Sequence, residues 1–458
     1  MLVRVISAVS KGAPAGERFP AGLNNAFMFA VFNALSFQII LSSPMVLYAK
    51  SLGASATVLG IIAGMMPLMV VFQIPAASYV VRIGYKRFVY AGWGTRVMFI
   101  FGMAAVPVTG FFLNATTRLS LMIMLLFGFN LSRGISSCAW LPWITSLVPA
   151  AIRGRYLAID SACVNLASFG VFVLAAFCLG AQPAAWQFSL IFAISAVMVA
   201  VSLTFLNRIP EWETLEQVRV SAAPVPWREI AGYQPFRKLL RVNMVWSLAY
   251  GGLTAFVVAF LKTELGLSEQ TILLVTAVSF LGGLSSLWFL GSRMDRHGSQ
   301  PVLKISFLVW VVIQVGWTAV AAGLCGPRWP LILGLQFMMG LAGALVSMAN
   351  VRLAMAIIPL LGRNHFFALF SVVGNLTQGI APILWGLLLD ALGPREWRWS
   401  VLVVNRYVVF FVAVSIFFSI AFILSRWLEE PRATRMEDLL REVFIDSPMR
   451  FWVRFWPR

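Results

Sequence analysis

Charged residues, and acidic residues most of all, are scarce in this chain. Only 11% of its 458 residues are charged and 60% are hydrophobic, whereas a typical soluble domain has about 25% charged residues. The chain contains 17 acids and 35 lysines and arginines. So few charges cannot solvate the surface of a soluble protein of this length. The composition therefore excludes a soluble globular protein and predicts an all-α polytopic membrane protein.

Histidine and cysteine are also rare, and neither occurs in a spacing that would bind a metal. The two histidines, His297 and His365, lie in predicted loops. Four cysteines are scattered through or beside apolar runs, where we expect small buried residues: Cys138, Cys163, Cys178 and Cys325. Without a nucleophile, base or metal set, the sequence predicts no enzyme activity, no cofactor and no metal.

Twelve apolar runs are long enough to cross a bilayer, which takes about 20 residues per helix. The longest connection is rich in proline and glutamate and divides the runs six and six. The predicted parts are an N-terminal six-helix half (1–207), a cytoplasmic linker (208–237), a C-terminal six-helix half (238–427) and a cytoplasmic tail (428–458) whose aromatics and arginines suit a membrane interface. The approximate spans are 22–49, 54–80, 88–112, 119–147, 155–180, 186–207, 238–262, 268–292, 301–324, 329–360, 364–391 and 399–426.

The distribution of lysine and arginine predicts the orientation of the spans. With the N-terminus inside, 25 of the 35 basic residues lie in inner segments and 6 in outer loops. The other four, Arg96, Arg133, Arg352 and Arg406, lie within spans. We therefore expect a protein of the inner (plasma) membrane with both termini in the cytoplasm. The same excess explains the formal net charge of +18 without a nucleic-acid partner.

A short loop bounded by glycines, GSRMDRHG, separates the eighth and ninth spans. Its pattern is Gly291, three residues, Asp295 and Arg296, one residue, and Gly298. This loop resembles the cytoplasmic loop signature of the major facilitator superfamily, which joins helices 8 and 9 in that family. A charged hairpin of this kind cannot lie in hydrocarbon, so it marks where two membrane helices reach water.

A weaker copy of the loop occurs at 77–87. Arg82 and Gly84 stand 214 residues before Arg296 and Gly298, whereas Ala77 and Val81 replace the first glycine and the aspartate of the signature. Two related loops at this spacing indicate an internal repeat of about half the chain.

The resemblance implies a secondary carrier, or permease, whose two halves rock about a central site to give alternating access. A third loop, with Arg153-Gly154-Arg155, is similar to a signature found between helices 4 and 5 of the same family. It provides either a gating contact or an inner turn with two cations at the lipid headgroups. The gating residues predicted from the three loops are Gly291, Asp295, Arg296, Gly298, Arg82, Gly84, Arg153 and Arg155.

Two arginines lie deep in predicted spans, Arg133 in the fourth and Arg352 in the tenth. A charge at mid-membrane costs about 2.5–3.5 kcal/mol on insertion scales, so it usually faces protein or a water-filled cavity. The pair could bind carboxylate, phosphate or sulfonate groups through forked hydrogen bonds, or each arginine could bond helix ends within its own half. Arg96 and Arg406 lie nearer the membrane faces and are expected to snorkel.

The resemblance also implies that helices 1, 4, 7 and 10 line the central cavity, and polar residues do gather on those spans. With one residue of span eleven added, the weaker candidates for substrate binding are Asn33, Gln38, Tyr250, Asn350 and Gln378.

The predicted spans lack a carboxylate near mid-membrane. Asp160, about one turn beyond Arg155, is expected to be an interfacial partner for Arg153 or Arg155, with a proton carrier as the alternative. This favours uniport, anion exchange or anion–proton symport over a pump for organic cations. We therefore predict a transporter of a small anionic solute. Its expected partners are that solute and the lipid bilayer, with a coupling ion left open and no nucleic acid, and we expect a monomer.

Two other functions stay open. The 19 methionines, 17 tryptophans and 37 phenylalanines could line the adaptable cavity of a multidrug-type exporter of lipophilic compounds. Transport would then survive neutralisation of both central arginines. A carrier-like sensor or assembly factor is the second alternative, suggested by Val81 in the degenerate loop and by the tail, and it would show no solute flux.

Overall fold

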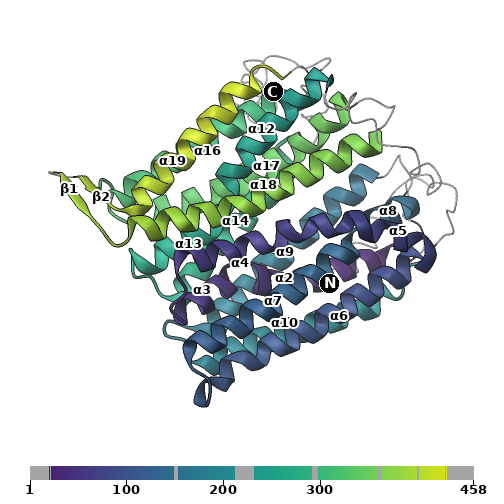
Figure 1. The fold of residues 1–458 in the computed structure, drawn as a ribbon, viewed down its shortest axis with the longest axis horizontal. Coiled ribbons are helices and arrows are strands. Elements are labelled where there is room, and N and C mark those ends of the chain that lie inside the picture. Colours follow the sequence, from purple (N-terminus) through teal and green to yellow (C-terminus); the bar gives the residue numbers. More distant parts are fainter. Residues whose placement is uncertain are drawn as a thin grey trace, which may run out of the picture. The chain divides into compact units, whose positions relative to one another are not determined.

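Helices dominate both halves of the sequence (Figure 1). The structure is a computed structural model that describes residues 20, 22–148, 153–211, 232–290, 298–358, 363–399, 402–428 and 430. The first half contains α2 (Asn24–Leu41), α3 (Ser43–Ser51), α4 (Ala56–Leu68), η2 (Met69–Phe72), α5 (Gln73–Ile83), α6 (Tyr85–Ala105), η3 (Val106–Phe111), α7 (Ala115–Ser137), α8 (Trp140–Leu147), α9 (Arg153–Leu179) and α10 (Ala185–Leu206). The second contains α12 (Gln234–Tyr250), α13 (Leu253–Thr263), α14 (Glu269–Leu290), α16 (Ser299–Ala321), α17 (Trp329–Ile357), α18 (Arg363–Leu392), β1 (Trp397–Trp399), β2 (Leu402–Val404) and α19 (Arg406–Ser425).

Eleven helical segments in the described ranges are long and apolar enough to cross a membrane. They correspond to all the predicted spans except the eighth. That span matches α14, a helix of 22 residues in which the side chains of 287–290 are not described. The predicted helical membrane fold, with twelve spans in two halves of six, is confirmed. Residues 212–231 of the linker, and all of the tail except 428 and 430, lie outside the described residues, so the predicted domain bounds stay predictions.

Spans one and seven are each interrupted near the same point of the repeat. The first breaks at Ser42, whose backbone is extended, and the seventh at Gly252, whose φ of +75° favours glycine. A Cβ at Gly252 would also overlap with the Pro382 ring. Span four is divided as well, into α7 and α8, with the break at Cys138 and Ala139.

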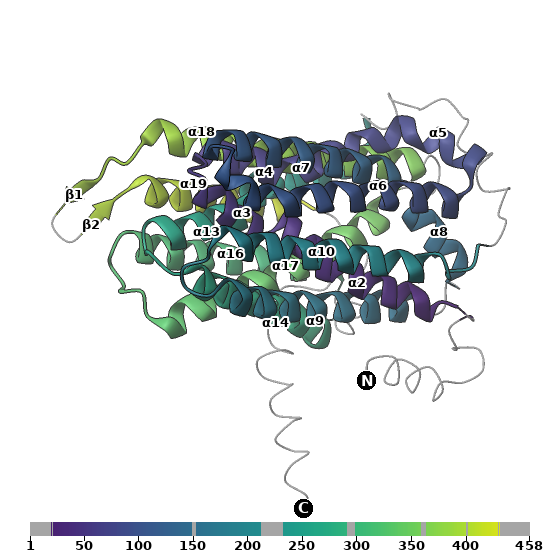
Figure 2. The same cartoon turned by 90° about the horizontal axis from the view of Figure 1, so that it is seen from below.

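The last span begins later than the hydropathy pattern predicts. The expected start was residue 399, but β1 and β2 form an antiparallel hairpin that extends beyond the first turn of α19 (Figure 2). The hairpin is rich in tryptophan, leucine and valine, which hydropathy alone cannot distinguish from a membrane helix. Asn405 then caps α19, because its Oδ1 accepts a hydrogen bond from Val408 N at 3.0 Å.

The internal repeat is visible in the helix positions. Helices α6 and α16 begin at residues 85 and 299, and α7 and α17 begin at 115 and 329, so both pairs are 214 residues apart. This is the offset predicted from the two loops. Gly84 and Gly298, the matched glycines of those loops, precede α6 and α16 with φ of +89° and +85°.

A glutamate caps the helix that follows each of these glycines. Glu211 Oε1 accepts from Lys86 N at 3.0 Å, at the start of α6. Glu430 accepts from Ser299 N at 2.8 Å and from Gln300 N at 2.7 Å, at the start of α16. Both acids follow the last helix of their half. A carboxylate at a helix N-terminus satisfies free amides and interacts favourably with the helix dipole.

Replacing Glu430 with glutamine is expected to destabilise the start of α16 by about 1 kcal/mol, because the neutral amide is a weaker acceptor. Hydrogen exchange at the Ser299 and Gln300 amides should become faster. Glu211→Gln is the matched control, since it should affect only the Lys86 amide. Unchanged exchange at 299 and 300 would show that Glu430 does not cap this helix.

The described helices form two compact units. Unit 1 comprises Met1–Ala223, Gly251–Phe280 and Asn375–Gly393, and unit 2 comprises Pro224–Tyr250, Leu281–Gly374 and Pro394–Arg458. Unit 1 therefore includes α13, about the first half of α14 and the last three-fifths of α18, together with the N-terminal helices. These added segments carry the loops that the orientation rule assigns to the extracellular side.

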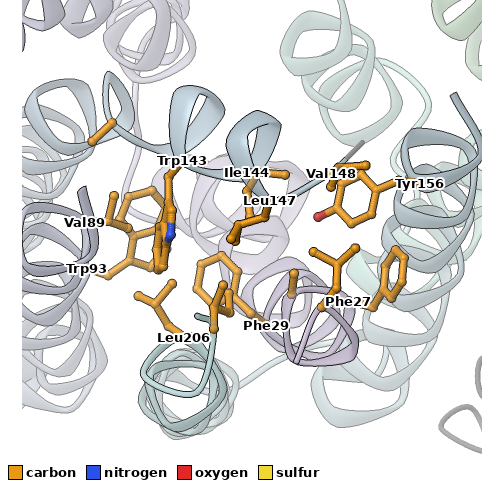
Figure 3. Close-up of a cluster of buried hydrophobic side chains, with 14 of the residues drawn as sticks. Phe27, Phe29, Val89, Trp93, Trp143, Ile144, Leu147, Val148, Tyr156 and Leu206 are labelled. Atoms are coloured by element: carbon orange, nitrogen blue, oxygen red, sulfur yellow. The ribbon is translucent and has the colours of Figure 1, made fainter. Parts of the chain in front are cut away.

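An aromatic core holds the predicted cytoplasmic end of unit 1 (Figure 3). Phe27 and Phe29 of α2 pack with Trp93 of α6, Trp143 of α8 and Tyr156 of α9. Trp143 is fully buried and its Nε1 donates to Pro210 O at 3.0 Å. This core fixes α2 and α6 against each other just below the polar residues described next.

Candidate functional site

Arg96 lies in the middle of α6 and is buried, with 2% of its surface exposed. Its guanidinium stacks on the Trp93 ring, with Cζ 3.6 Å from the ring centroid, and lies 5.8 Å from that of Phe129 on α7. The prediction that Arg96 snorkels to a membrane face is therefore wrong. The spacing of Trp93 and Arg96, three residues apart on one helix face, is the sequence signal that could have indicated a buried stack.

Close packing of α6 on α7 brings Arg133 to the same layer. Gly92 lets the Ser136 side chain approach so closely that a Cβ at residue 92 would overlap with it. Ser132 Oγ also donates to Gly92 O at 2.9 Å. Arg133 follows Ser132 and is half-buried. The Phe129 ring, 5.8 Å from Arg96 Cζ, lies about one turn before Arg133, so the two like charges stand on neighbouring parts of α6 and α7. Below, Arg96 and Arg133 are called the arginine pair.

The arginine pair has no counter-ion in the described part of the chain. No hydrogen bond or ion pair joins the Arg133 guanidinium to a residue of the described ranges. Arg96 Nε and Nη2 are buried without a hydrogen-bond partner, and so is the side-chain oxygen of Asn130, one turn before Arg133. Buried polar atoms normally have a hydrogen-bond partner in the protein or in water. The unpaired donors of Arg96 and the unpaired acceptor of Asn130 are therefore available to water or a ligand.

Asn33 contacts the arginine pair indirectly, through the Trp93 ring on which Arg96 stacks. It lies on α2 and its Oδ1 accepts from Trp93 Nε1 at 3.3 Å, which orients the ring under Arg96. Gln38, on the same helix, is half-buried. Of the two predicted candidates on α2, Asn33 therefore contacts this layer through Trp93, whereas the structure gives no such contact for Gln38.

The candidates of unit 2 lie around α12 and α17. Asn350 Nδ2 donates to Asn243 Oδ1 at 2.9 Å, so this amide already has a partner. Tyr250 stacks on Trp246 with ring centroids 4.7 Å apart, in an aromatic group with Trp310 and Phe418. Trp310 is fully buried, so these rings pack mainly with one another.

Arg352 and Gln378 differ in their surroundings. Arg352 is half-buried on α17 and is engaged with neighbouring groups, unlike Arg133. Gln378 is half-buried on α18, in the segment that belongs to unit 1. The two arginines predicted as a pair thus belong to different units.

Only some of the predicted gating residues can be located. Arg82 is exposed near the end of α5. Gly84 and Gly298 are the positive-φ residues described above. Helix α9 begins at Arg153, but the side chains of Arg153 and Arg155 are not described. Gly291, Asp295 and Arg296 lie outside the described residues. Asp160 lies half-buried on α9, near Tyr156 and Cys163.

A contact that sequence reasoning missed joins α4 to α18 at the predicted extracellular end of unit 1. Asp390, near the end of α18, accepts from Ala56 N at 3.0 Å and from Thr57 N at 2.8 Å. Ser55 caps the same helix, accepting from Val58 N at 3.3 Å. The α18 carboxylate and Ser55 together satisfy the first amides of α4.

Glycines allow α4 and α18 to touch below this cap. A Cβ at Gly60 would overlap with Pro382 O, and one at Gly64 would overlap with Gly379 O. Gly60 and Gly64 form a GxxxG pattern, which lets two helix backbones approach closely in membranes. We call the contact of Asp390, Gly60, Gly64 and Gly379 the α4–α18 seam.

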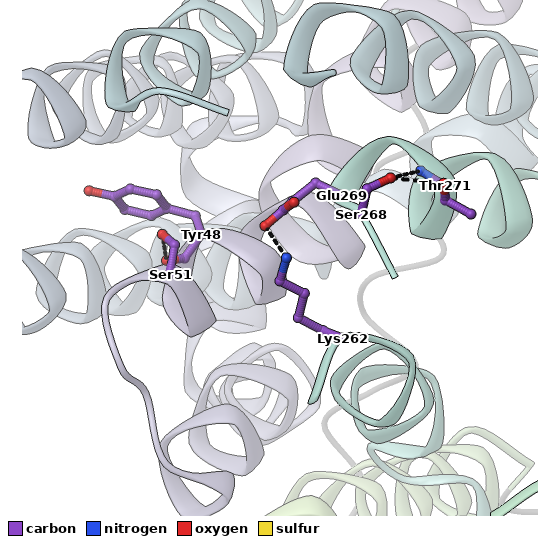
Figure 4. A network of polar contacts seen from close by, with 6 residues as sticks. All are labelled: Tyr48, Ser51, Lys262, Ser268, Glu269 and Thr271. Atoms are coloured by element: carbon purple, nitrogen blue, oxygen red, sulfur yellow. Dashed lines mark hydrogen bonds and ion pairs between the residues drawn. The ribbon is translucent and has the colours of Figure 1, made fainter. Parts of the chain in front are cut away.

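An ion pair lies at the same predicted extracellular end of unit 1 (Figure 4). Lys262, at the end of α13, is 2.6 Å from Glu269 Oε1, at the start of α14. Glu269 is 6% exposed, so removal of Lys262 would leave a buried charge without its partner. In the described ranges, no group of three or more His, Cys, Asp and Glu side chains is placed to hold a metal.

Known proteins resemble this chain in fold and in family profile. It resembles a mutant of the nucleoside transporter NupG (TM-score 0.68, 9% identity, covering 88% of this chain and 99% of that one). It also resembles the inward-open xylose transporter XylE from E. coli (0.67, 14%, 91% and 99%) and a POT family transporter in complex with 5-aminolevulinic acid (0.65, 13%, 89% and 95%). No curated protein matches the sequence. The profile of the Major Facilitator Superfamily matches twice, over residues 26–268 and 247–456. The chain therefore belongs to the major facilitator superfamily of membrane transporters.

Proposed function

We propose that this transporter moves a small anionic solute by alternating access and that Arg133 binds the solute. The observation that carries the proposal is the unpaired guanidinium of Arg133 on α7 within the described part of the chain. A charge within a membrane helix is costly unless it meets a counter-charge or water. The acidic group of the solute would supply that counter-charge through forked hydrogen bonds.

Arg352 is the weaker of the two arginine candidates. It has at least one interaction within the chain, so it is less clearly available to a solute than Arg133. The other candidates, Asn33, Gln38, Tyr250, Asn350 and Gln378, would contribute polar contacts rather than charge. Asn350 and Asn33 already hold protein partners, which favours supporting roles for both.

The α4–α18 seam supports the alternating-access part of the proposal. It joins helices from the two sequence halves at the end predicted to be extracellular, where a carrier needs a gate. Its polar bonds are few and its helices meet backbone to backbone, so the seam can separate without leaving buried side-chain charges behind. Gating by the loops at 77–87 and 291–298 stays a prediction.

Neutralising Arg133 is the test of substrate binding. In liposomes containing the purified full chain, Arg133→Gln should reduce uptake of the transported anion by about 100-fold, because a charged partner of the solute is lost. Carboxylates, phosphate and sulfonates should be compared with neutral sugars and lipophilic cations. Arg118→Gln is the control, since it removes an equal charge from the opposite end of α7.

The outcomes distinguish the three candidate functions. Loss of anion uptake in Arg133→Gln alone supports the proposal. Transport of lipophilic compounds that is unchanged in Arg133→Gln would instead favour a multidrug-type exporter. Absence of flux for every class in the wild type would favour a sensor or assembly factor.

A further inference from the structure

Arg96 is a buried cation for which the protein supplies no counter-ion in the described ranges. Its Nε and Nη2 have no hydrogen-bond partner, and its Cζ lies 5.8 Å from the ring centroid of Phe129, about one turn before Arg133 on α7. Both arginines stand on helices held together by Gly92, Ser132 and Ser136. Two like charges therefore stand on closely packed helices, and the burial of Arg96 leaves their repulsion weakly screened.

Stacking on the Trp93 ring does not compensate the buried positive charge of Arg96. A cation over an aromatic face gains less than the cost of taking a guanidinium out of water. The ring does set the plane of Arg96, because Asn33 fixes the indole through its Nε1. A guanidinium with a fixed plane and free N–H groups is suited to a planar or multiply charged oxyanion.

We propose that the arginine pair forms one binding site for a doubly charged anionic group of the transported solute. Arg133 would contact one acidic oxygen and Arg96 would provide the second charge and a further hydrogen bond. A monoanion would neutralise only one of the two cations, so the site should discriminate by charge. The chemical class is a dicarboxylate or a phosphate in its dianionic form.

This inference rests on the proposed anion transport, since it assigns a second charge to the Arg133 site. The first measurement uses the wild-type chain alone. Binding of succinate is compared with binding of monomethyl succinate by calorimetry in detergent, and inorganic phosphate is measured at pH 6 and pH 8. Succinate should bind at least about tenfold more tightly than its monoester, and phosphate should bind more tightly at pH 8, where it is a dianion.

Variants of Arg96 then test whether this residue causes the preference for dianions over monoanions. Arg96→Gln should reduce the preference for the dianion to near unity while leaving monoanion binding measurable. Arg96→Lys keeps the charge and should retain the preference with weaker binding overall. Arg118→Gln, on the same helix as Arg133, should behave like the wild type. If Arg96→Gln does not fold, two measurements still test the dianion site. They are the binding preference of Arg96→Lys and the wild-type comparisons of succinate with its monoester and of phosphate at pH 6 and pH 8.

Each result supports or overturns a specific claim. Equal binding of succinate and its monoester, or of phosphate at the two pH values, overturns the dianion site but leaves Arg133 as an anion-binding residue. The same conclusion follows if Arg96→Gln keeps the full preference. If none of these anions binds, the dianion site is overturned, and the uptake panel that includes sulfonates decides the proposed function. If Arg133→Gln binds them as the wild type does, the proposed function fails as well.

Discussion

Asp390→Asn is expected to release the first turn of α4. The carboxylate is the acceptor for the Ala56 and Thr57 amides, which have no partner inside the helix. A hydrogen bond to a charged group contributes about 1.5–3 kcal/mol, so exchange of these two amides should become about 10- to 150-fold faster. An asparagine side chain cannot replace the carboxylate, because it offers one acceptor oxygen and turns an amide group toward the helix N-terminus.

Hydrogen exchange resolved to single residues is the direct measurement, and it contains its own control. The Val58 amide is bonded to Ser55 rather than to Asp390, so its exchange should change little. In membranes, Asp390→Asn should also increase labelling of a cysteine at Leu59 by an impermeant maleimide added outside. Leu59 lies beside Gly60 and is 1% exposed. Unchanged exchange at 56 and 57 would refute the role of Asp390 in the α4–α18 seam.

Gly60→Ala is expected to separate the same two helices without touching a charged group. The added Cβ would overlap with Pro382 O, a backbone atom that cannot move by itself. Overpacking of this kind costs about 1–3 kcal/mol or more. The melting temperature in detergent should fall, and the Ala56 and Thr57 amides should lose protection although Asp390 is intact.

Gly170→Ala is the matched control for this substitution. Gly170 lies on α9 in the same unit, and nothing lies within 4 Å of the position of its Cβ. Alanine should therefore stabilise α9 by up to about 1 kcal/mol through its higher helix propensity. The two glycine variants should thus shift the melting temperature in opposite directions. Equal shifts would mean that the α4–α18 seam is not tightly packed.

Hydropathy and the two related loops predicted most of the fold. Membrane spans are long apolar runs, so their number and order can be read directly, and the offset of 214 residues agrees with the starts of α6, α7, α16 and α17. Breaks at Ser42 and Gly252 and the hairpin before α19 were not predicted. A hydropathy average does not register a local change of backbone direction within an apolar run.

The candidate site was predicted less completely, for two physical reasons. Distance from the end of a span suggested that Arg96 snorkels, but burial depends on which helix face a residue occupies. Asp390 was overlooked because its partners are backbone amides 334 and 333 residues away, which have no residue signature. The GxxxG pattern at Gly60 and Gly64 was the available sign of a close helix contact.

The arginine pair, which has no counter-ion among the described residues, would make transport sensitive to the membrane potential. An empty site would hold two positive charges inside the electric field of the membrane, where each full charge crossing 100 mV changes the free energy by about 2.3 kcal/mol. A bound dianion would cancel both charges. Return of the empty carrier should then depend on voltage, while movement of the loaded carrier should not, so that the resting potential would bias the cycle toward one direction of transport.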